Sequence, residues 1–176
     1  MLFISSFTSC NEKSHKKKIK MEYFKNFRGL SDRVGNQIHE AGLNDIQTLM
    51  SYSKDSPKGM FLNGRCIAIL SEKTTYTVDE EVRIIHVFET INKEEELLIN
   101  GPKQVYGEFV NEKLSTKLSS VDDYPWLPFY DGKAIKGPGI DYNFEITKYQ
   151  FKKLGTYNIL WKVGNLESNA ISITVK

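Results

Sequence analysis

From Gly64 onward, apolar residues recur at every second position, which is the periodicity of a β-strand with one buried face. A central run, Val82 to Ile91, is apolar at nearly every position through Phe88, as in a strand buried on both faces. Such strands must bury their apolar faces against another layer. Three later segments alternate most cleanly: Ile140, Tyr142, Phe144 and Ile146; Tyr157, Ile159, Trp161 and Val163; and Ile171, Ile173 and Val175.

Shorter segments bring the expected number of strands to about seven, separated by turns. The sequence therefore predicts a mainly β fold, an antiparallel β-sandwich over residues 64–176. Trp161 lies mid-strand, so we expect it to be buried between the sheets. Cys66 lies in another alternating run, where we expect a free, buried thiol. The shorter segments span residues 65–70, 75–78, 97–99 and 104–110.

Two segments of this body resemble immunoglobulin-like domains. Phe151-Lys152-Lys153-Leu154-Gly155-Thr156-Tyr157 is similar to the corner of such domains, where a Gly turn precedes a Tyr that starts the next strand. Lys73-x-x-Tyr76-x-Val78-x-Glu80-x-Val82 resembles the start of the second strand in bacterial envelope domains of this type. The resemblance covers about residues 60–176 and implies an immunoglobulin-like β-sandwich, but no activity. No Cys pair stands at the inter-sheet positions, which excludes the antibody branch.

Residues 1–10 are uncharged and mostly apolar, with small residues directly before Cys10. Phe7-Thr8-Ser9-Cys10 resembles the lipobox of bacterial lipoprotein signals, in which a peptidase cuts before a cysteine that carries a diacylglycerol. The resemblance implies that residues 1–9 are a signal peptide and that Cys10 is lipidated. No basic segment precedes the apolar run, so we expect that the natural start lies further upstream or that the signal is truncated.

Residues 10–21 would then be the lipidated cysteine and a basic tether to the bilayer. Five lysines and one glutamate fall within residues 11–20. The remaining 19 basic and 21 acidic residues nearly balance, so the body provides no general field for nucleic acid. No apolar stretch reaches the roughly 20 residues of a membrane-spanning helix. We therefore expect a lipid-anchored monomer in a bacterial cell envelope, at the outer membrane.

Residues 22–63 are expected to form two short helices that pack on the β body. The first would begin at Ser31, a good N-cap, and stop at Gly42. The second would have Asn44 as its N-cap. The inward residues would be Val34, Ile38 and Ala41 in the first helix, and Ile46, Leu49 and Met50 in the second.

Residues 30–65 also resemble the opening of the C-terminal domain of the bacterial RNA polymerase alpha subunit. In that family the residues matching Arg33 and Asn36 contact DNA, as does a Gly-basic turn that Asn63-Gly64-Arg65 would match. The family needs another helix after that turn, whereas residues 65–70 alternate as a strand. The charge of the body also disfavours phosphate binding. We favour packing helices over DNA binding. The resemblance rests on Leu30-Ser31-x-Arg33-x-x-Asn36-x-Ile38-x-x-Ala41-Gly42-Leu43-x-x-Ile46-x-x-Leu49.

The longest segment without periodicity, residues 111–139, contains four aromatic residues within seven positions. A long loop in a compact domain is commonly functional, and aromatic rings suit protein or carbohydrate recognition. The alternative is that the rings fold back and plug an open end of the sandwich. The candidate binding residues are Tyr124, Trp126, Phe129 and Tyr130.

No catalytic or metal-binding pattern accompanies this loop. Acidic residues flank it and could hold calcium, but their spacing matches no metal loop and suits turns equally well. The histidines have no Cys or carboxylate partners at ligand spacing. We expect neither an enzyme nor a cofactor. The flanking acidic residues are Asp122, Asp123 and Asp131, and the histidines are His15, His39 and His86.

Two functions stay open. The first is an envelope-anchored module that binds a protein or a glycan through the aromatic loop or a sheet face. The second is an accessory or inhibitory domain that blocks an envelope enzyme with a loop, by analogy with other small exported sandwiches.

Overall fold

The structure, a computed structural model, describes residues 29–99, 101–118 and 134–176. Within this part the chain is mainly β, as predicted, with fourteen strands and one helix. The expectation of about seven strands and two helices was wrong, because bends split long segments and several strands have only two or three residues. The elements are β1 (Ser31–Val34), β2 (Gln37–Glu40), α2 (Leu43–Met50), β3 (Arg65–Leu70), β4 (Thr75–Tyr76), β5 (Glu81–Thr90), β6 (Glu96–Leu98), β7 (Glu108–Val110), β8 (Lys113–Leu114), β9 (Ala134–Lys136), β10 (Gly139–Asp141), β11 (Thr147–Gln150), β12 (Gly155–Val163), β13 (Leu166–Glu167) and β14 (Ile171–Val175).

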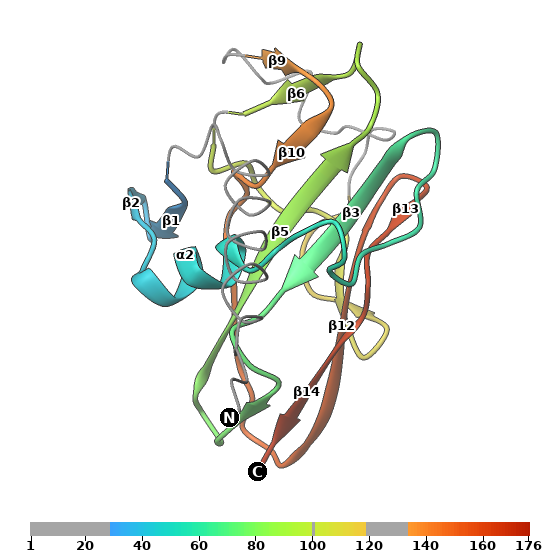
Figure 1. Cartoon of the computed structure of the whole chain (residues 1–176). Coiled ribbons are helices and arrows are strands. Elements are labelled where there is room, and N and C mark those ends of the chain that lie inside the picture. Colours follow the sequence, from blue (N-terminus) through green and yellow to red (C-terminus); the bar gives the residue numbers. More distant parts are fainter. Residues whose placement is uncertain (1–28, 100, 119–133) are drawn as a thin grey trace, which may run out of the picture.

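The first main sheet is built around the long strand β5 (Figure 1). β3 pairs with one edge of β5, from Arg65 opposite Thr90 to Leu70 opposite Ile85. Two successive strands, β10 and β11, pair with the other edge. All of these pairings are antiparallel. β5 is buried along most of its length, which confirms the central strand predicted from its continuous apolar run.

The second main sheet is built around β12. One edge of β12 pairs with β14 and with the short β13, and the other edge pairs with β7, all antiparallel. β8 extends the sheet beyond β7, and β4 runs parallel to β14. Consecutive strands β3 and β4 thus belong to different sheets, and the chain crosses between the sheets after Leu70.

The larger core lies between these two sheets, which face each other (Figure 1). Trp161 of β12 is fully buried there, as predicted. Its Nε1 donates to the Tyr106 carbonyl at 2.8 Å, and its ring meets the Phe144 ring edge-on. Ile67 and Ile69 of β3 contribute from the opposite sheet. A β-rich chain with this layering is consistent with a β-sandwich.

The side chain of Asn169 joins the edge of β3 to the chain between β13 and β14. Its Oδ1 accepts from the Ile69 N–H and its Nδ2 donates to the Ile69 carbonyl, both at 3.0 Å. Nearby, the Gly59 N–H donates to the Ile67 carbonyl at 2.9 Å. A Cβ on Gly59 would lie 1.8 Å from the Glu167 carbonyl oxygen, so this close approach needs glycine.

A second, smaller core lies on the outer face of the first sheet, beneath α2. Leu49 of α2 and Tyr52 are fully buried against Ala68 and Val87. The second predicted helix is therefore confirmed, although its N-cap is Gly42, two residues before the predicted cap Asn44.

The first predicted helix was wrong, because residues 31–40 form the antiparallel hairpin β1–β2. Val34 and Ile38, assigned to an inward helical face, are 57% and 53% exposed. Gly35 has a φ of 60° and begins a two-residue turn with Asn36, a conformation that glycine adopts at low cost. The resemblance to the DNA-binding domain requires a helix at residues 31–40, and the structure has a β-hairpin there instead.

The strand expected over residues 140–146 is interrupted between β10 and β11. Lys103 pairs through its backbone with Asn143 and Glu145 and so occupies the gap. Phe144 consequently enters the core between the sheets, whereas Tyr142 and Ile146 pack into the smaller core. The expectation that these side chains all point one way was wrong.

Candidate functional site

The candidate lipidation and binding residues predicted from the sequence lie outside the described part of the chain. This holds for the candidate lipidation site Cys10, and for the aromatic candidates Tyr124, Trp126, Phe129 and Tyr130. Their roles stay predictions. Among the described residues, no group of three or more His, Cys, Asp and Glu side chains could hold a metal ion. No helix in that part combines the length and apolar character needed to cross a membrane.

The described residues bring together a buried histidine and a carboxylate that the sequence analysis left unpaired. His86 Nε2 lies 3.3 Å from Glu108 Oε1, and both side chains are inaccessible to solvent. The Tyr149 hydroxyl donates to Glu108 Oε2 at 2.9 Å, and burial, together with that carboxylate, raises the pKa of Tyr149. Since the pair is sealed in the core, it serves packing and not substrate binding.

A second buried cluster surrounds Glu89 on the outer face of the first sheet. The Tyr52 hydroxyl donates to Glu89 Oε2 at 2.6 Å, and Lys58 forms an ion pair with the same carboxylate. Cys66 is free and fully buried beside it, as predicted. Burial, reinforced by Glu89, raises the pKa of Cys66 to about 12, so the thiol is not a nucleophile at neutral pH.

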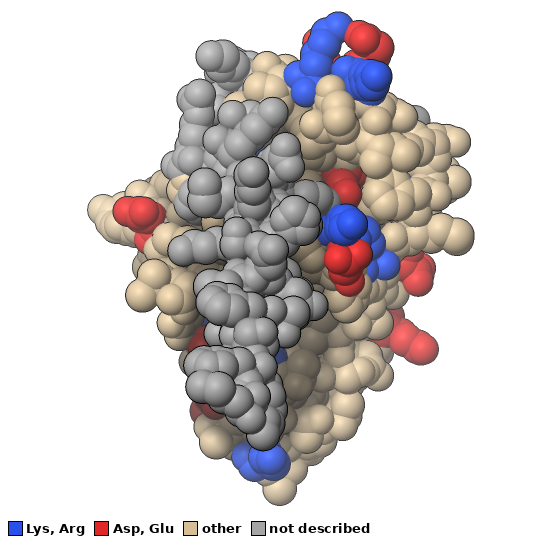
Figure 2. Space-filling model, viewed as in Figure 1, with Lys and Arg blue, Asp and Glu red and all other residues tan. Residues whose placement is uncertain are grey.

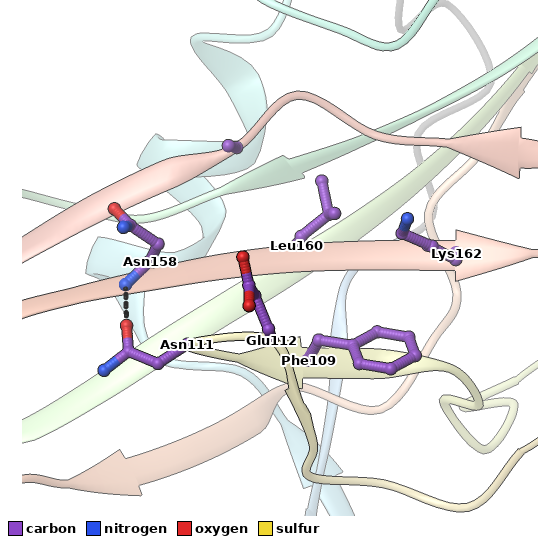
Figure 3. A pocket seen from close by; sticks show the side chains of 7 residues that line it. Phe109, Asn111, Glu112, Asn158, Leu160 and Lys162 are labelled. Atoms are coloured by element: carbon purple, nitrogen blue, oxygen red, sulfur yellow. Dashed lines mark hydrogen bonds between the residues drawn. The ribbon is translucent and has the colours of Figure 1, made fainter.

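The candidate site is instead a groove of about 500 Å³ on the outer face of the second sheet (Figure 3). This volume falls within the ~300–1,000 Å³ typical of small-molecule sites. Ile159, Trp161 and Val163 of β12 point into the core, so the alternate residues of β12 face outward. The groove is lined by Phe109, Asn111, Glu112, Asn158, Leu160, Lys162 and Ala170.

The floor of the groove is apolar. Phe109 of β7 stands directly opposite Leu160 of β12, and Leu114 of β8 stands opposite Phe109 on its other side. All three side chains are partly buried. Cross-strand neighbours on one face pack against each other. An apolar band therefore crosses three adjacent strands of an otherwise polar face.

Asn111 lies at one end of the groove, where its side chain and its backbone both form hydrogen bonds with the backbone of Asn158. It begins the β7–β8 turn with Glu112, at φ values of 47° and 65°. Its Oδ1 accepts from the Asn158 N–H at 2.8 Å, drawn as a dashed line in Figure 3, and its own N–H donates to the Asn158 carbonyl at 2.8 Å. The Asn158 Oδ1 in turn accepts from the Ser172 hydroxyl at 2.7 Å. Both amide oxygens are thereby engaged.

Three other polar groups of the groove are available to bind a ligand. Within the described part of the chain, neither the Nδ2 groups of Asn111 and Asn158 nor the Glu112 carboxylate has a partner. Lys162, at the other end of the groove, is paired with Glu167 at 2.7 Å. Sequence reasoning placed the inward residues of β12 correctly. The β7–β8 turn that brings Asn111 to Asn158 was not predicted from the sequence.

Charges elsewhere on the surface are mixed. On the face drawn in Figure 2, Lys and Arg lie beside Asp and Glu near its top and middle. Exposed pairs include Lys136 with Glu94 and Lys73 with Glu80. Among the described residues visible on this face, these mixed charges form no continuous basic stripe of the kind that binding to nucleic acid phosphates requires.

Comparisons of the chain with known protein families, with curated proteins and with solved structures find no match.

Proposed function

We propose that this protein is a ligand-binding module of the bacterial cell envelope, anchored to the outer membrane through lipidated Cys10. The observation that carries the proposal is the groove on the second sheet. Its donors and its carboxylate are held on rigid strands and a tight turn, and they have no partner among the described residues. Preorganised polar groups around an apolar floor are typical of binding sites.

An immunoglobulin-like fold is part of this proposal. The Tyr157 hydroxyl donates to the Lys153 carbonyl at 3.0 Å, which resembles the tyrosine corner of such domains. The chain also crosses from β3, at an edge of the first sheet, directly to β4, at an edge of the second sheet. Both features support the resemblance found in the sequence. The fold positions a binding face without implying a reaction.

We propose binding and not catalysis, because the groove offers amides, one free carboxylate and an ion-paired lysine. Covalent catalysis needs a nucleophile next to a base. Among the residues that the structure describes, the groove lining contains no Ser, Thr, Cys, Tyr or His. Glu112 alone could act as a base, but its exposed position gives it no partner for a second catalytic role.

The experiment for the anchor uses the two cysteines as a matched pair. The parent, a Cys10→Ala variant and a Cys66→Ala variant are expressed in a Gram-negative host, and membrane and soluble fractions are compared. Cys10→Ala should move the protein to the soluble fraction, whereas Cys66→Ala should stay with the membrane. Equal membrane association of the Cys10→Ala variant and the parent would refute the anchor.

The second function, an accessory or inhibitory domain, is favoured by one exposed loop. Met60, Phe61 and Leu62 are 88%, 39% and 42% exposed and lie next to each other before β3. Consecutive exposed apolar residues mark candidate protein contacts. Capture from envelope extract with Met60→Ser, beside Leu154→Ser as a control at another exposed apolar position (71% exposed), separates the functions. Loss of an enzyme partner with Met60→Ser alone would support inhibition.

A further inference from the structure

We propose that the groove binds a neutral carbohydrate chain, with its sugar rings on Phe109 and Leu160 and its hydroxyls on Asn111, Asn158 and Glu112. This inference rests on the proposed binding function and adds the class of ligand. It follows from which hydrogen-bonding groups the groove leaves unused, from its apolar floor and from its charge.

The unused polar groups complement sugar hydroxyls. A hydroxyl both donates and accepts, so it can accept from an amide Nδ2 and donate to a carboxylate oxygen. Asn111 offers its Nδ2 donor from the β7–β8 turn and Asn158 offers its own from the adjacent strand β12, and Glu112 follows Asn111 in the same turn. Figure 3 shows the Glu112 carboxylate between the two amides and the Phe109 ring. Donors and an acceptor thus lie close enough to meet hydroxyls of one ligand.

The apolar floor complements the other face of a sugar. A pyranose ring carries C–H groups that pack on an aromatic ring, and aromatic side chains contribute contact area at low entropic cost. The Phe109 ring lies along the sheet face beside Lys162 (Figure 3). Leu160 continues the apolar surface towards Ala170. A ligand with one apolar face and a polar rim would match this arrangement.

The charge of the groove disfavours an anionic ligand. Lys162 is neutralised by Glu167, and Glu112 leaves one carboxylate in excess. A phosphate or carboxylate ligand would meet that charge at close range, and like charges that approach each other are unfavourable. A neutral polyhydroxylated chain meets no such repulsion.

The position within the sheet disfavours an added peptide strand. An extended peptide binds a sheet through an unpaired backbone edge. Over the groove, β12 is paired with β7 on one side and with β13 and β14 on the other. The ligand therefore meets side chains and not free backbone groups, which again favours a carbohydrate.

Three Asn→Asp variants test the inference without removing a structural hydrogen bond. Asn111→Asp and Asn158→Asp keep the oxygen that accepts from the Asn158 N–H or from Ser172, and replace only the free donor. The matched control is Asn63→Asp. Asn63 is also an exposed residue with a positive φ, 51°, but it lies outside the groove lining.

The probes are short neutral homo-oligomers of hexose and of N-acetylhexosamine, with phosphorylated oligosaccharides beside them. Binding is followed by NMR on ¹⁵N-labelled protein, including the side-chain amides of asparagine. A neutral oligomer should shift the Asn111 and Asn158 amide signals. The variant carrying both groove substitutions should bind about tenfold or more weakly, because both Nδ2 donors are lost and a hydroxyl that already donates to Glu112 has no second proton for the new carboxylates. Asn63→Asp should bind like the parent.

The inference is overturned if no neutral oligomer shifts the groove signals, or if the phosphorylated probes shift them more strongly. It is also overturned if the groove variants bind neutral oligomers as well as the parent does. The proposed function has a separate readout. If the groove variants still lose capture of an envelope protein, the groove is a binding site for protein. If they change neither sugar binding nor capture, both proposals fail.

Discussion

His86 and Glu108 face each other across the core, with Nε2 and Oε1 3.3 Å apart and neither side chain accessible to solvent. They come from opposite sheets, His86 from β5 and Glu108 from β7. Tyr149 of β11 donates to the second oxygen of Glu108, so one carboxylate receives groups from two strands of the facing sheet. The His86 ring also meets Trp161 edge-on, with the ring centroids 4.9 Å apart.

We expect Glu108→Leu to lower the free energy of unfolding by about 3 kcal/mol, because it leaves the buried His86 Nε2 without its partner and removes one of the partners of the Tyr149 hydroxyl. Adding His86→Leu should recover part of that loss, because an apolar pair leaves fewer buried polar groups unsatisfied. Urea unfolding of the parent, both single variants and the double variant measures the coupling. Additive effects would show that the two side chains do not interact.

Trp161→Ala should lower the free energy of unfolding by about 3–5 kcal/mol, the usual effect of truncating a buried aromatic residue. The loss combines the cavity between the sheets with the hydrogen bond from Nε1 to Tyr106. Thr174→Ala, at an exposed position of the same sheet, should change stability by less than about 0.5 kcal/mol. Thermal or urea melts compare the two, and equal melting of Trp161→Ala and the parent would contradict its burial.

Stability should fall in acid through Asp32, which anchors the β1–β2 hairpin to Arg83 at 2.6 Å and to Lys148 at 2.9 Å. Burial alone raises the pKa of Asp32, but hydrogen bonds from Arg83 and Lys148 outweigh it and hold the pKa below its ordinary value. A lowered folded pKa adds stability above the unfolded value of about 3.9. That stability is lost as the pH falls through the lowered pKa.

Asp32→Asn should therefore reduce stability at neutral pH and flatten the acid limb of a plot of unfolding free energy against pH. The matched control is Asp55→Asn, at an exposed position. Hydrogen exchange of residues 31–40 at neutral pH should accelerate in Asp32→Asn and not in Asp55→Asn. Parallel acid limbs for the parent and Asp32→Asn would contradict the role of this carboxylate.

Cys66 should resist thiol reagents while the protein is folded. It is fully buried, and burial with Glu89 nearby raises its pKa to about 12, so little thiolate forms near neutral pH. In a Cys10→Ala background it is the one remaining cysteine. Labelling with a thiol reagent should then follow global unfolding and become fast in denaturant. Rapid labelling in native buffer would show that the smaller core opens locally.

Strong, local periodicity explains what could be predicted from the sequence. β5, β12 and β14 each carry enough alternating or continuous apolar residues to specify a strand and its buried face. The burial of Trp161 and Cys66 follows from that pattern alone.

Where two periods compete, the sequence was ambiguous. Val34, Ile38 and Ala41 fit a helical face, but the Gly35-Asn36 turn favours a hairpin. The buried apolar residues of this segment are Leu30 and Ala41. The Gly35-Asn36 dipeptide favours a turn, whereas the apolar spacing favours a helix, and the prediction followed the spacing. The periodicity of one segment cannot distinguish a helix from a hairpin here, because tertiary packing decides between them.

The candidate site depends on pairings between distant residues. Asn158 meets Asn111 across 47 positions, and His86 meets Glu108 across 22. No spacing rule relates such positions. The register of β7 against β12 brings Asn111 to Asn158, and the packing of one sheet on the other brings His86 to Glu108. The outward residues of β12 were available from its alternation. The turn that supplies Asn111 and Glu112 was not.

Asn169 has a consequence for copies of this chain that meet at high density. By pairing with both the N–H and the carbonyl of Ile69, its amide occupies the place where another strand would dock on β3. Unpaired strand edges are templates for aggregation and domain swapping. If the chain is anchored to a membrane as proposed, copies would collide in two dimensions, and this one side chain would keep neighbours from joining edge to edge.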